Sequence, residues 1–423
     1  MPGMGAQVGP VGERERIEVM DVLRGFALLG ILLMNIEAFV GPVMEALGGV
    51  NPRFSGADRW VDAAIYVLVQ GKFMTLFSLL FGMGFAVMLE RADLAGADGS
   101  RLYSRRLLAL LGIGLVHALL IWSGDILVSY ALFGFMLLLL FRRTPVSRLP
   151  KWGIALYLIP LVATWAWALA VTAAQQDPQA AAKMHKGMAE QGAQWVAMGE
   201  AERQAFGAGS YLEAVSQRAA DTGAQLTFMA IGGWMLLAMF LFGSWFVRSG
   251  VIRNAGMHLS LFRRLRNIGL GVGLPLMLWS AWRHPTMSMS EMDFGIALAQ
   301  SAALGASLLM CLGYMSLIVL AMQQPAWARR LRWLAPAGRM ALTNYLLQSV
   351  ICTAIFYGYG LGYFERMPRA WQPLFVIALF SLQLIFSHWW LSRYRLGPME
   401  WLWRWLTYGT RPPMQPAGGL IPR

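Results

Sequence analysis

Charged residues are scarce in this chain. Asp, Glu, Lys and Arg together make up 13% of its 423 residues, whereas hydrophobic residues make up 57%. Soluble proteins carry about a quarter charged residues. The composition therefore excludes an ordinary soluble enzyme and favours a bundle of membrane-spanning helices.

Cysteine and histidine are also rare, with two and five residues respectively. Cys311 and Cys352 both fall inside apolar stretches, where they cannot form a disulfide framework or a zinc site with paired spacing. The chain also lacks a nucleotide-binding Gly loop, a Walker sequence, a metal motif and a serine elbow. We therefore expect no metal, and we expect both cysteines to be packing residues.

What the sequence does contain is a series of ten apolar stretches. Each approaches the roughly 20 residues that a helix needs to cross a hydrocarbon core. They cover about 22–43, 72–90, 106–122, 125–141, 152–173, 225–247, 266–282, 294–322, 340–357 and 371–391. The sequence predicts an all-α fold, a polytopic transmembrane helix bundle of about ten spans. The first stretch lacks a small-residue cleavage site, so we interpret it as a retained span.

The loops between these stretches alternate between Arg-rich and Arg-poor. If residue 1 is cytoplasmic, most of the 35 basic residues fall in cytoplasmic segments. This positive-inside bias predicts that both termini lie on the cytoplasmic side of a bacterial inner membrane. Basic loops beside anionic lipid headgroups account for the net charge of +13, so we expect no nucleic-acid partner.

One long polar segment divides the chain. We predict a cytoplasmic N-terminal segment (1–21), a first five-helix half (22–173), an outer-side loop (174–224), a second five-helix half (225–391), and a cytoplasmic interfacial helix and tail (392–423). The loop composition suits one or two amphipathic helices, which would serve as a tether between the halves or as a lid on an outer-facing cavity. Residues 412–423, with several Pro and Gly, are expected to be disordered.

Polar side chains within the spans are few, and each costs free energy in hydrocarbon unless it is paired. His117 lies deepest, eleven residues and about 17 Å along the helix from Arg106, on the same face. Arg24 and Asn35 have the same spacing in the first span. Cations at a cytoplasmic mouth with polar groups further in would fit a long ligand with phosphates at one end, such as coenzyme A. The alternative for His117 is a hydrogen bond to a neighbouring helix.

Four further polar residues are candidates for the same site. Asp125 follows His117 by eight residues through a tight hairpin, so it could orient the imidazole or share its proton, or it could simply cap the next helix. Glu37 could act on His117 from the first span. Asn344 and Gln348 lie four apart on one face, either as ligand-binding groups or as hydrogen-bonding groups between helices.

Five segments carry a resemblance to a known family. They are MDVLRGFALLGILLMN (20–35), KFMTLFSLLFGMGFA (72–86), RRLLALLGIGLVHALLIWSGDILVSYALFG (105–134), GRMALTNYLLQS (338–349) and GPMEWLWRWLTYG (397–409). Over nearly its whole length the chain resembles the YeiB-like bacterial membrane proteins, domain-of-unknown-function family 418.

That family is grouped with the membrane acyltransferases, which include the acyltransferase-3 proteins and the lysosomal glucosaminide acetyltransferase. These relatives move acyl groups from a cytoplasmic donor, often acetyl-CoA, to sugars or similar acceptors on the far side. The resemblance implies that Arg24 and Gly25 lie near the donor entrance. It does not supply the relatives' catalytic histidine, because the first span offers Asn35 and the region before the second offers none.

The leading hypothesis is an inner-membrane acyltransferase that uses acetyl-CoA or another acyl-CoA as donor. The candidate catalytic residues are His117, Asp125 and Glu37, and the candidate donor-binding residues are Arg24, Gly25, Asn35, Arg106, Asn344 and Gln348. Expected partners are membrane lipids and a small-molecule, sugar or lipid acceptor. The acyl group, the acceptor and the oligomeric state stay open, with a homodimer as one alternative. The rival hypothesis is a transporter or lipid-handling protein, favoured by the five-plus-five arrangement and the missing histidine.

Overall fold

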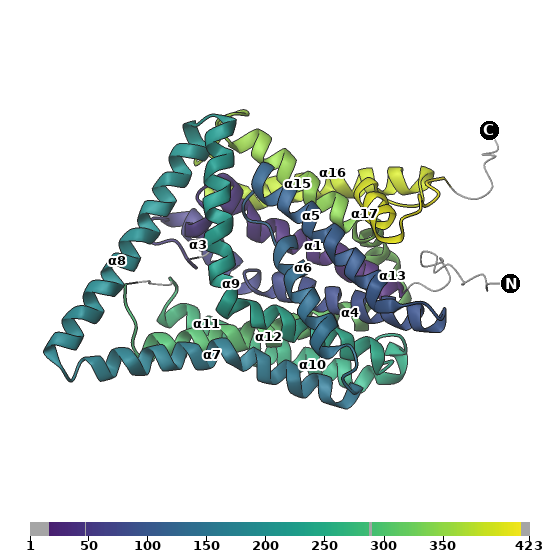
Figure 1. Ribbon diagram of the computed structural model, residues 1–423, viewed down its shortest axis with the longest axis horizontal. Coiled ribbons are helices and arrows are strands. Elements are labelled where there is room, and N and C mark those ends of the chain that lie inside the picture. The colour runs from purple at the N-terminus through teal and green to yellow at the C-terminus, as the bar shows by residue number, and fades with distance from the viewer. Residues whose placement is uncertain (1–16, 47, 287–289, 416–423) are drawn as a thin grey trace.

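The computed structural model describes residues 17–46, 48–286 and 290–415. Regular structure in these ranges is helical, apart from one isolated bridge between Gly49 and Thr286 (Figure 1). The all-α prediction is therefore confirmed. The expectations for residues 1–16 and 416–423 lie outside the described residues.

The helices differ in length and in hydrophobicity. The longer ones are α1 (Glu18–Val40), α4 (Lys72–Leu94), α5 (Gly99–Leu120), α7 (Leu149–Ala174), α8 (Pro178–Glu202), α9 (Tyr211–Arg248), α12 (Phe294–Met322), α15 (Ala341–Phe356) and α16 (Gln372–Arg393). The shorter ones are α2 (Val43–Ala46), α3 (Gly56–Leu68), α6 (Leu127–Met136), α10 (Leu259–Gly271), α11 (Gly273–Arg283), α13 (Pro325–Leu331), α14 (Ala335–Arg339) and α17 (Pro398–Tyr408). Seven helical segments in the described ranges are long and apolar enough to cross a membrane, and two more apolar helices are shorter. The protein is a polytopic helical membrane protein.

Each predicted apolar stretch is helical along most of its length, but the stretch 266–282 is broken. It divides at Val272 into α10 and α11. Glycines flank the break on the side that faces α12. A Cβ atom added at Gly269 would lie 2.4 Å from the Leu309 carbonyl oxygen, and one at Gly273 would lie 3.0 Å from the Leu309 Cβ. The break therefore allows both pieces to approach the α12 backbone closely.

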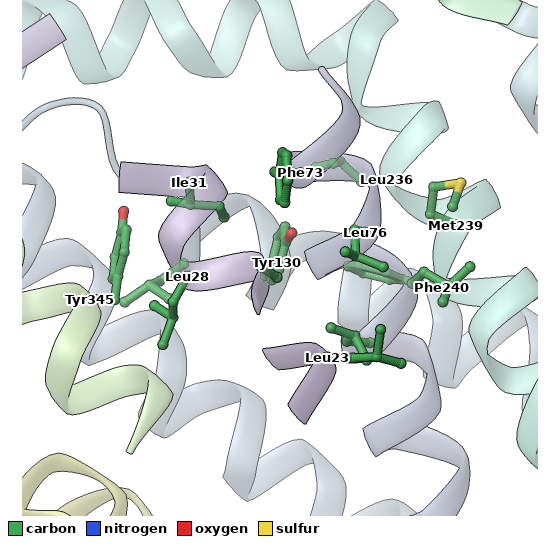
Figure 2. Packing of buried hydrophobic residues seen from close by; sticks show 14 of the residues in the cluster. Leu23, Leu28, Ile31, Phe73, Leu76, Tyr130, Leu236, Met239, Phe240 and Tyr345 are labelled. Atoms are coloured by element: carbon green, nitrogen blue, oxygen red, sulfur yellow. The ribbon is translucent and has the colours of Figure 1, made fainter. Parts of the chain in front are cut away.

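The core of the bundle lies where α4 crosses α9. A Cβ atom at Gly243 would lie 1.9 Å from the Leu79 carbonyl oxygen, so these two backbones touch. Figure 2 shows the apolar layer beside this crossing, with Leu76 and Phe240 near Tyr130. The Tyr130 and Phe240 rings are 5.4 Å apart and nearly perpendicular, a favourable arrangement for aromatic pairs.

The two ends of the bundle differ in chemistry. We call the end at which α1 and α5 begin the basic end; α13 and α17 lie there, whereas α8 lies obliquely across the opposite end (Figure 1). The segment 174–224 consists of α8, a π-helical turn (Arg203–Ala208) and the start of α9. α9 begins inside this predicted loop because Ser210 and Glu213 form a capping box at its N-terminus.

Candidate functional site

A cavity of about 280 Å³ lies at the basic end, between α1, α4, α5, α6, α15 and α17. Arginines from six different elements or loops line it. They are Arg24, Arg91, Arg106, Arg339, Arg395 and Arg404. Asp21 and Glu400 are the acidic side chains among the described lining residues. The structure thus brings Arg24 and Arg106 together, as the sequence predicts, and adds four arginines.

The two acidic residues do not neutralise this cavity. Asp21 pairs with Arg24 at 2.8 Å between Oδ1 and Nη1. Glu400 is occupied by the N-terminus of α15, where it accepts hydrogen bonds from the Leu342 and Thr343 N–H groups and from the Thr343 hydroxyl. Burial raises the pKa of Glu400, and the hydrogen bonds from Thr343 partly oppose that rise. Because arginine keeps its charge, the described lining residues, six arginines and two acidic residues, carry an excess of positive charge that suits a phosphorylated ligand.

Arg106 lines the cavity and its guanidinium packs against an aromatic ring. Its guanidinium lies 3.8 Å from the centre of the Trp403 ring, and it makes no ion pair with a residue that the structure describes. The Trp403 indole in turn donates a hydrogen bond to the Arg106 carbonyl oxygen at 2.9 Å, which fixes α17 against α5. The segment after Gly397 is helical as α17, and it forms one wall of the cavity.

Beyond the arginines, the cavity becomes apolar. Leu28, Ile31, Phe77 and Leu80 line its middle, and it ends at Ile126, Leu127, Tyr130 and Tyr345. An anionic group at the mouth and an uncharged chain further in would match this lining.

His117 lies one aromatic ring beyond the deep end. Its ring centre is 5.1 Å from that of Tyr345, which lines the cavity, while His117 itself does not. Its Nδ1 is 2.7 Å from Asp125 Oδ2, and both side chains are fully buried. His117 Nε2 has no hydrogen-bond partner among the described residues. The predicted contact between His117 and Asp125 is therefore present in the structure.

The hairpin between α5 and α6 explains this pairing. The N–H groups of Ile121 and Trp122 both bond to the His117 carbonyl oxygen, which ends α5 tightly. Asp125 Oδ1 then accepts the Val128 N–H at 2.8 Å and so caps α6. One carboxylate thus caps a helix with one oxygen and orients an imidazole with the other.

The remaining predicted residues lie elsewhere. Asn35 is half-buried and has no side-chain hydrogen bond to a described residue. Gly25 is a packing position, because a Cβ atom there would lie 2.2 Å from the Leu334 carbonyl oxygen. Asn344 donates to Ser387 at 2.9 Å and Gln348 donates to Gln383 at 2.9 Å, so both join α15 to α16.

Glu37 lies near the opposite end and pairs with Arg369 at 2.9 Å. Arg369 also binds Asp62 at 2.9 Å, and it is fully buried. Glu37 lines a second cavity of about 320 Å³, together with Glu45, Arg53, Glu365, Gln372 and others. The structure pairs Glu37 with Arg369 and not with His117. Sequence reasoning did not find Arg369, which lies among residues expected to be loop.

Comparison with known proteins shows the family to which the chain belongs. The chain is 36% identical over 421 residues to the uncharacterized protein YxaH of Bacillus subtilis, covering 94% of this chain and 96% of that protein. It is 35% identical over 404 residues to the uncharacterized protein YeiB of Escherichia coli, covering 93% and 96%. The family model described as a protein of unknown function, DUF418, matches residues 246–410. The chain belongs to the DUF418 family.

The resemblance predicted from sequence is thereby confirmed, and the relatives are bacterial. A third relative, an uncharacterized 39.9 kDa protein of Bacillus acidopullulyticus, is 26% identical over 413 residues, covering 96% of this chain and 97% of that protein. No solved structure matches the chain significantly. The assignment of function therefore depends on the site itself.

Proposed function

We propose that this DUF418 protein is an acyltransferase of the bacterial inner membrane, with ten spans and its basic end in the cytoplasm. One observation carries the proposal: an arginine-lined cavity ends at a tyrosine ring, and a buried His–Asp pair lies directly behind that ring. The alternation of basic loops supports the orientation. The donor is an acyl-CoA, whose phosphates would bind at the mouth near Arg24 and Arg106.

The pair has the chemistry of a general base. The Asp125 carboxylate accepts the Nδ1–H of a neutral His117, which leaves a lone pair on Nε2, the atom without a partner. Nε2 would take the proton from an acceptor hydroxyl or amine as that group attacks the thioester carbonyl carbon. The carbon–sulfur bond then breaks, and the imidazolium returns the proton to the leaving thiolate. The sum is one thioester consumed, one ester or amide formed and one thiol released.

Tyr345 must move for this reaction to occur. Its ring lines the cavity, and the centre of that ring lies 5.1 Å from the centre of the His117 ring, which does not line the cavity. A change of side-chain rotamer would join the cavity to Nε2.

A second candidate is transport of a solute or lipid. It is favoured by the two cavities at different ends of α1: Arg24, Leu28 and Ile31 line the first, whereas Glu37 and Val40 line the second. Alternating access around a fixed central helix would use both.

Proteoliposomes containing the purified protein distinguish the two. Acetyl-CoA and a long-chain acyl-CoA are supplied on the basic side, with bacterial envelope extract as acceptor, and released thiol is measured. The acyltransferase releases thiol only when extract is present, and His117→Gln lowers the rate about 100-fold or more. His388→Gln is the matched control, because His388 Nε2 contacts the Trp333 carbonyl oxygen away from the cavity. Movement of a solute without thiol release would refute the enzyme and support the transporter.

A further inference from the structure

A second buried polar cluster lies beneath α8 at the opposite end of the bundle. It contains Glu202 of α8, Arg218 and Asp221 of α9, and Tyr357 and Tyr359, which follow α15. The side chains of the first three residues are buried, each at most 1% exposed. None of these residues lines either of the two cavities described above.

The Glu202 carboxyl accepts few hydrogen bonds. Its Oε2 accepts the Met44 N–H at a long 3.4 Å, and its Oε1 has no partner among the described residues. An ionised carboxylate with no access to water would require several hydrogen bonds to its two oxygens. This environment is therefore one for a neutral carboxylic acid.

Neighbouring arginines do not supply a counterion for an ionised Glu202. Arg203 follows Glu202 in the chain, but it is 20% exposed and already binds Glu45 at 2.5 Å, Glu365 at 3.0 Å and Glu200 at 3.6 Å. Arg218 donates to the Tyr359 hydroxyl at 2.6 Å and to the Leu120 carbonyl oxygen at 3.2 Å. Arg203 is thus shared by carboxylates nearer the surface, and Arg218 is the cation within the described cluster.

Asp221 is the natural counterion of Arg218. The two are three residues apart on α9, and Asp221 accepts hydrogen bonds from the Ser123 hydroxyl at 3.0 Å and from Gln217 at 2.7 Å. The positive charge of Arg218 and the negative charge of the hydrogen-bonded Asp221 carboxylate therefore cancel. A second carboxylate at Glu202 would leave the cluster with an uncompensated negative charge, whereas a proton on Glu202 leaves it neutral.

We propose that Glu202 and Asp221 form a proton-binding site, in which one proton on Glu202 keeps the buried cluster neutral. A proton is the ligand that this packing admits, because the cluster opens into neither cavity. The pKa of Glu202 is raised to about 8, chiefly by burial and then by the nearby Asp221 carboxylate, against opposing contributions from the Met44 and Val43 N–H groups and Arg203. The proton is therefore held at neutral pH and released in mildly alkaline conditions.

The site is connected to the hairpin that carries Asp125. Arg218, Asp221 and Gln225 lie on one face of α9, and they contact in turn the Leu120 carbonyl oxygen, the Ser123 hydroxyl and the Asp125 carbonyl oxygen. Loss of the proton places two carboxylates beside one arginine, and their repulsion loosens α8 and this hairpin together.

The sign of the pH effect follows from the raised pKa. The stability that neutral Glu202 contributes is fully present below its ordinary pKa of 4.5, and it is lost progressively as the pH rises to about 8. The opposite end of the molecule should therefore loosen at alkaline pH.

Infrared spectroscopy of the full-length protein in lipid nanodiscs tests the site, with no need for enzymatic activity. The carbonyl band of a protonated carboxylic acid should be present at neutral pH and should disappear with a midpoint near pH 8. Glu202→Gln should remove this band and leave any band from Glu400. Glu190→Gln is the control, since Glu190 lies on the same helix with its side chain 63% exposed, and it should change nothing. If Glu202→Gln leaves the titrating band at its full intensity, the proposal is overturned.

Asp221→Asn tests whether the two carboxyls act as a pair. Removing the Asp221 charge removes one cause of the raised pKa, so the midpoint of the Glu202 band should move to lower pH. An unchanged midpoint would show that Glu202 titrates independently and would refute the shared site. Because the readout is a carboxyl band, either result is independent of whether the protein transfers acyl groups.

Discussion

The Asp125→Asn variant examines whether the buried His–Asp pair performs chemistry. Asparagine keeps an oxygen that can accept the Val128 N–H, and it caps helices about as well as aspartate does. The substitution is close to isosteric, so the free energy of unfolding should change by less than about 1 kcal/mol. What it removes is the negative charge 2.7 Å from His117 Nδ1.

The loss of that charge changes which nitrogen carries the proton. An amide NH₂ can donate to Nδ1, and the imidazole then carries its proton on Nε2, where it can no longer act as a base. In enzymes built on such a pair, this change lowers the rate by about 10⁴-fold, and loss of a positioned base lowers it by about 10²–10⁴-fold. We therefore expect acyl transfer to fall by about 10²–10⁴-fold, which corresponds to about 3–5 kcal/mol of transition-state stabilisation.

The assay is thiol release in proteoliposomes, measured alongside the melting temperature. Asp98→Asn is the matched control, because Asp98 caps α5 through the N–H groups of Ser100 and Arg101 and does not line the cavity. The control should keep its rate. If Asp125→Asn transfers acyl groups at the normal rate while His117→Gln does not, Asp125 is only a helix cap and the general-base argument for the pair fails.

Three further predictions follow from the cavity, the topology and the packing. In an equilibrium binding assay, Arg106→Gln should weaken binding of an acyl-CoA by about 10–100-fold, the equivalent of one charge-assisted hydrogen bond. High salt should reproduce part of this loss, whereas Arg105→Gln, at an exposed position, should have little effect in the same assay. Cysteine introduced at Gly187 should react with an impermeant reagent on intact cells, whereas cysteine at the exposed Met257 should react only after lysis, and the reverse pattern would invert the proposed orientation. Gly25→Ala should destabilise the protein by about 1–3 kcal/mol in thermal unfolding because its methyl group would meet the Leu334 carbonyl oxygen, while Gly112→Ala, which faces open space, should be neutral or stabilising.

Local sequence patterns were sufficient for the helices and for one site contact. The apolar stretches predict helices because helical membrane segments satisfy their own backbone groups, and that requirement is local. The contact between His117 and Asp125 was also predictable, since a tight hairpin leaves residues eight apart little freedom to separate. The break at Val272 was not predictable from local sequence, because it depends on glycines that approach the backbone of α12, a helix elsewhere in the chain.

The arginine cavity could not be predicted in full for the same reason. Arg91, Arg339 and the pair Arg395 and Arg404 belong to three different segments that the sequence predicts to be cytoplasmic, and each is explained there by the positive-inside bias alone. Their convergence depends on how α4, α14 and α17 pack around α1, which no periodicity in a single segment specifies. Likewise, Arg369 pairs with Glu37 and Asp62 across more than 300 residues of chain in each case, so its role appears only in the folded structure.

The position of Tyr345 bears on why His117 is buried. Under the proposed function, a thioester bound in this cavity would be exposed to water, and a base with free access to the cavity would also activate water against it. Tyr345 lines the cavity beside the imidazole, and in the described conformation Nε2 is buried and has no hydrogen-bond partner among the described residues. An acceptor that moved this ring as it bound would bring the base, the acceptor and the thioester together, whereas water could not displace a whole aromatic side chain. The burial of His117 is thus consistent with a base that acts in transfer but is withheld from hydrolysis.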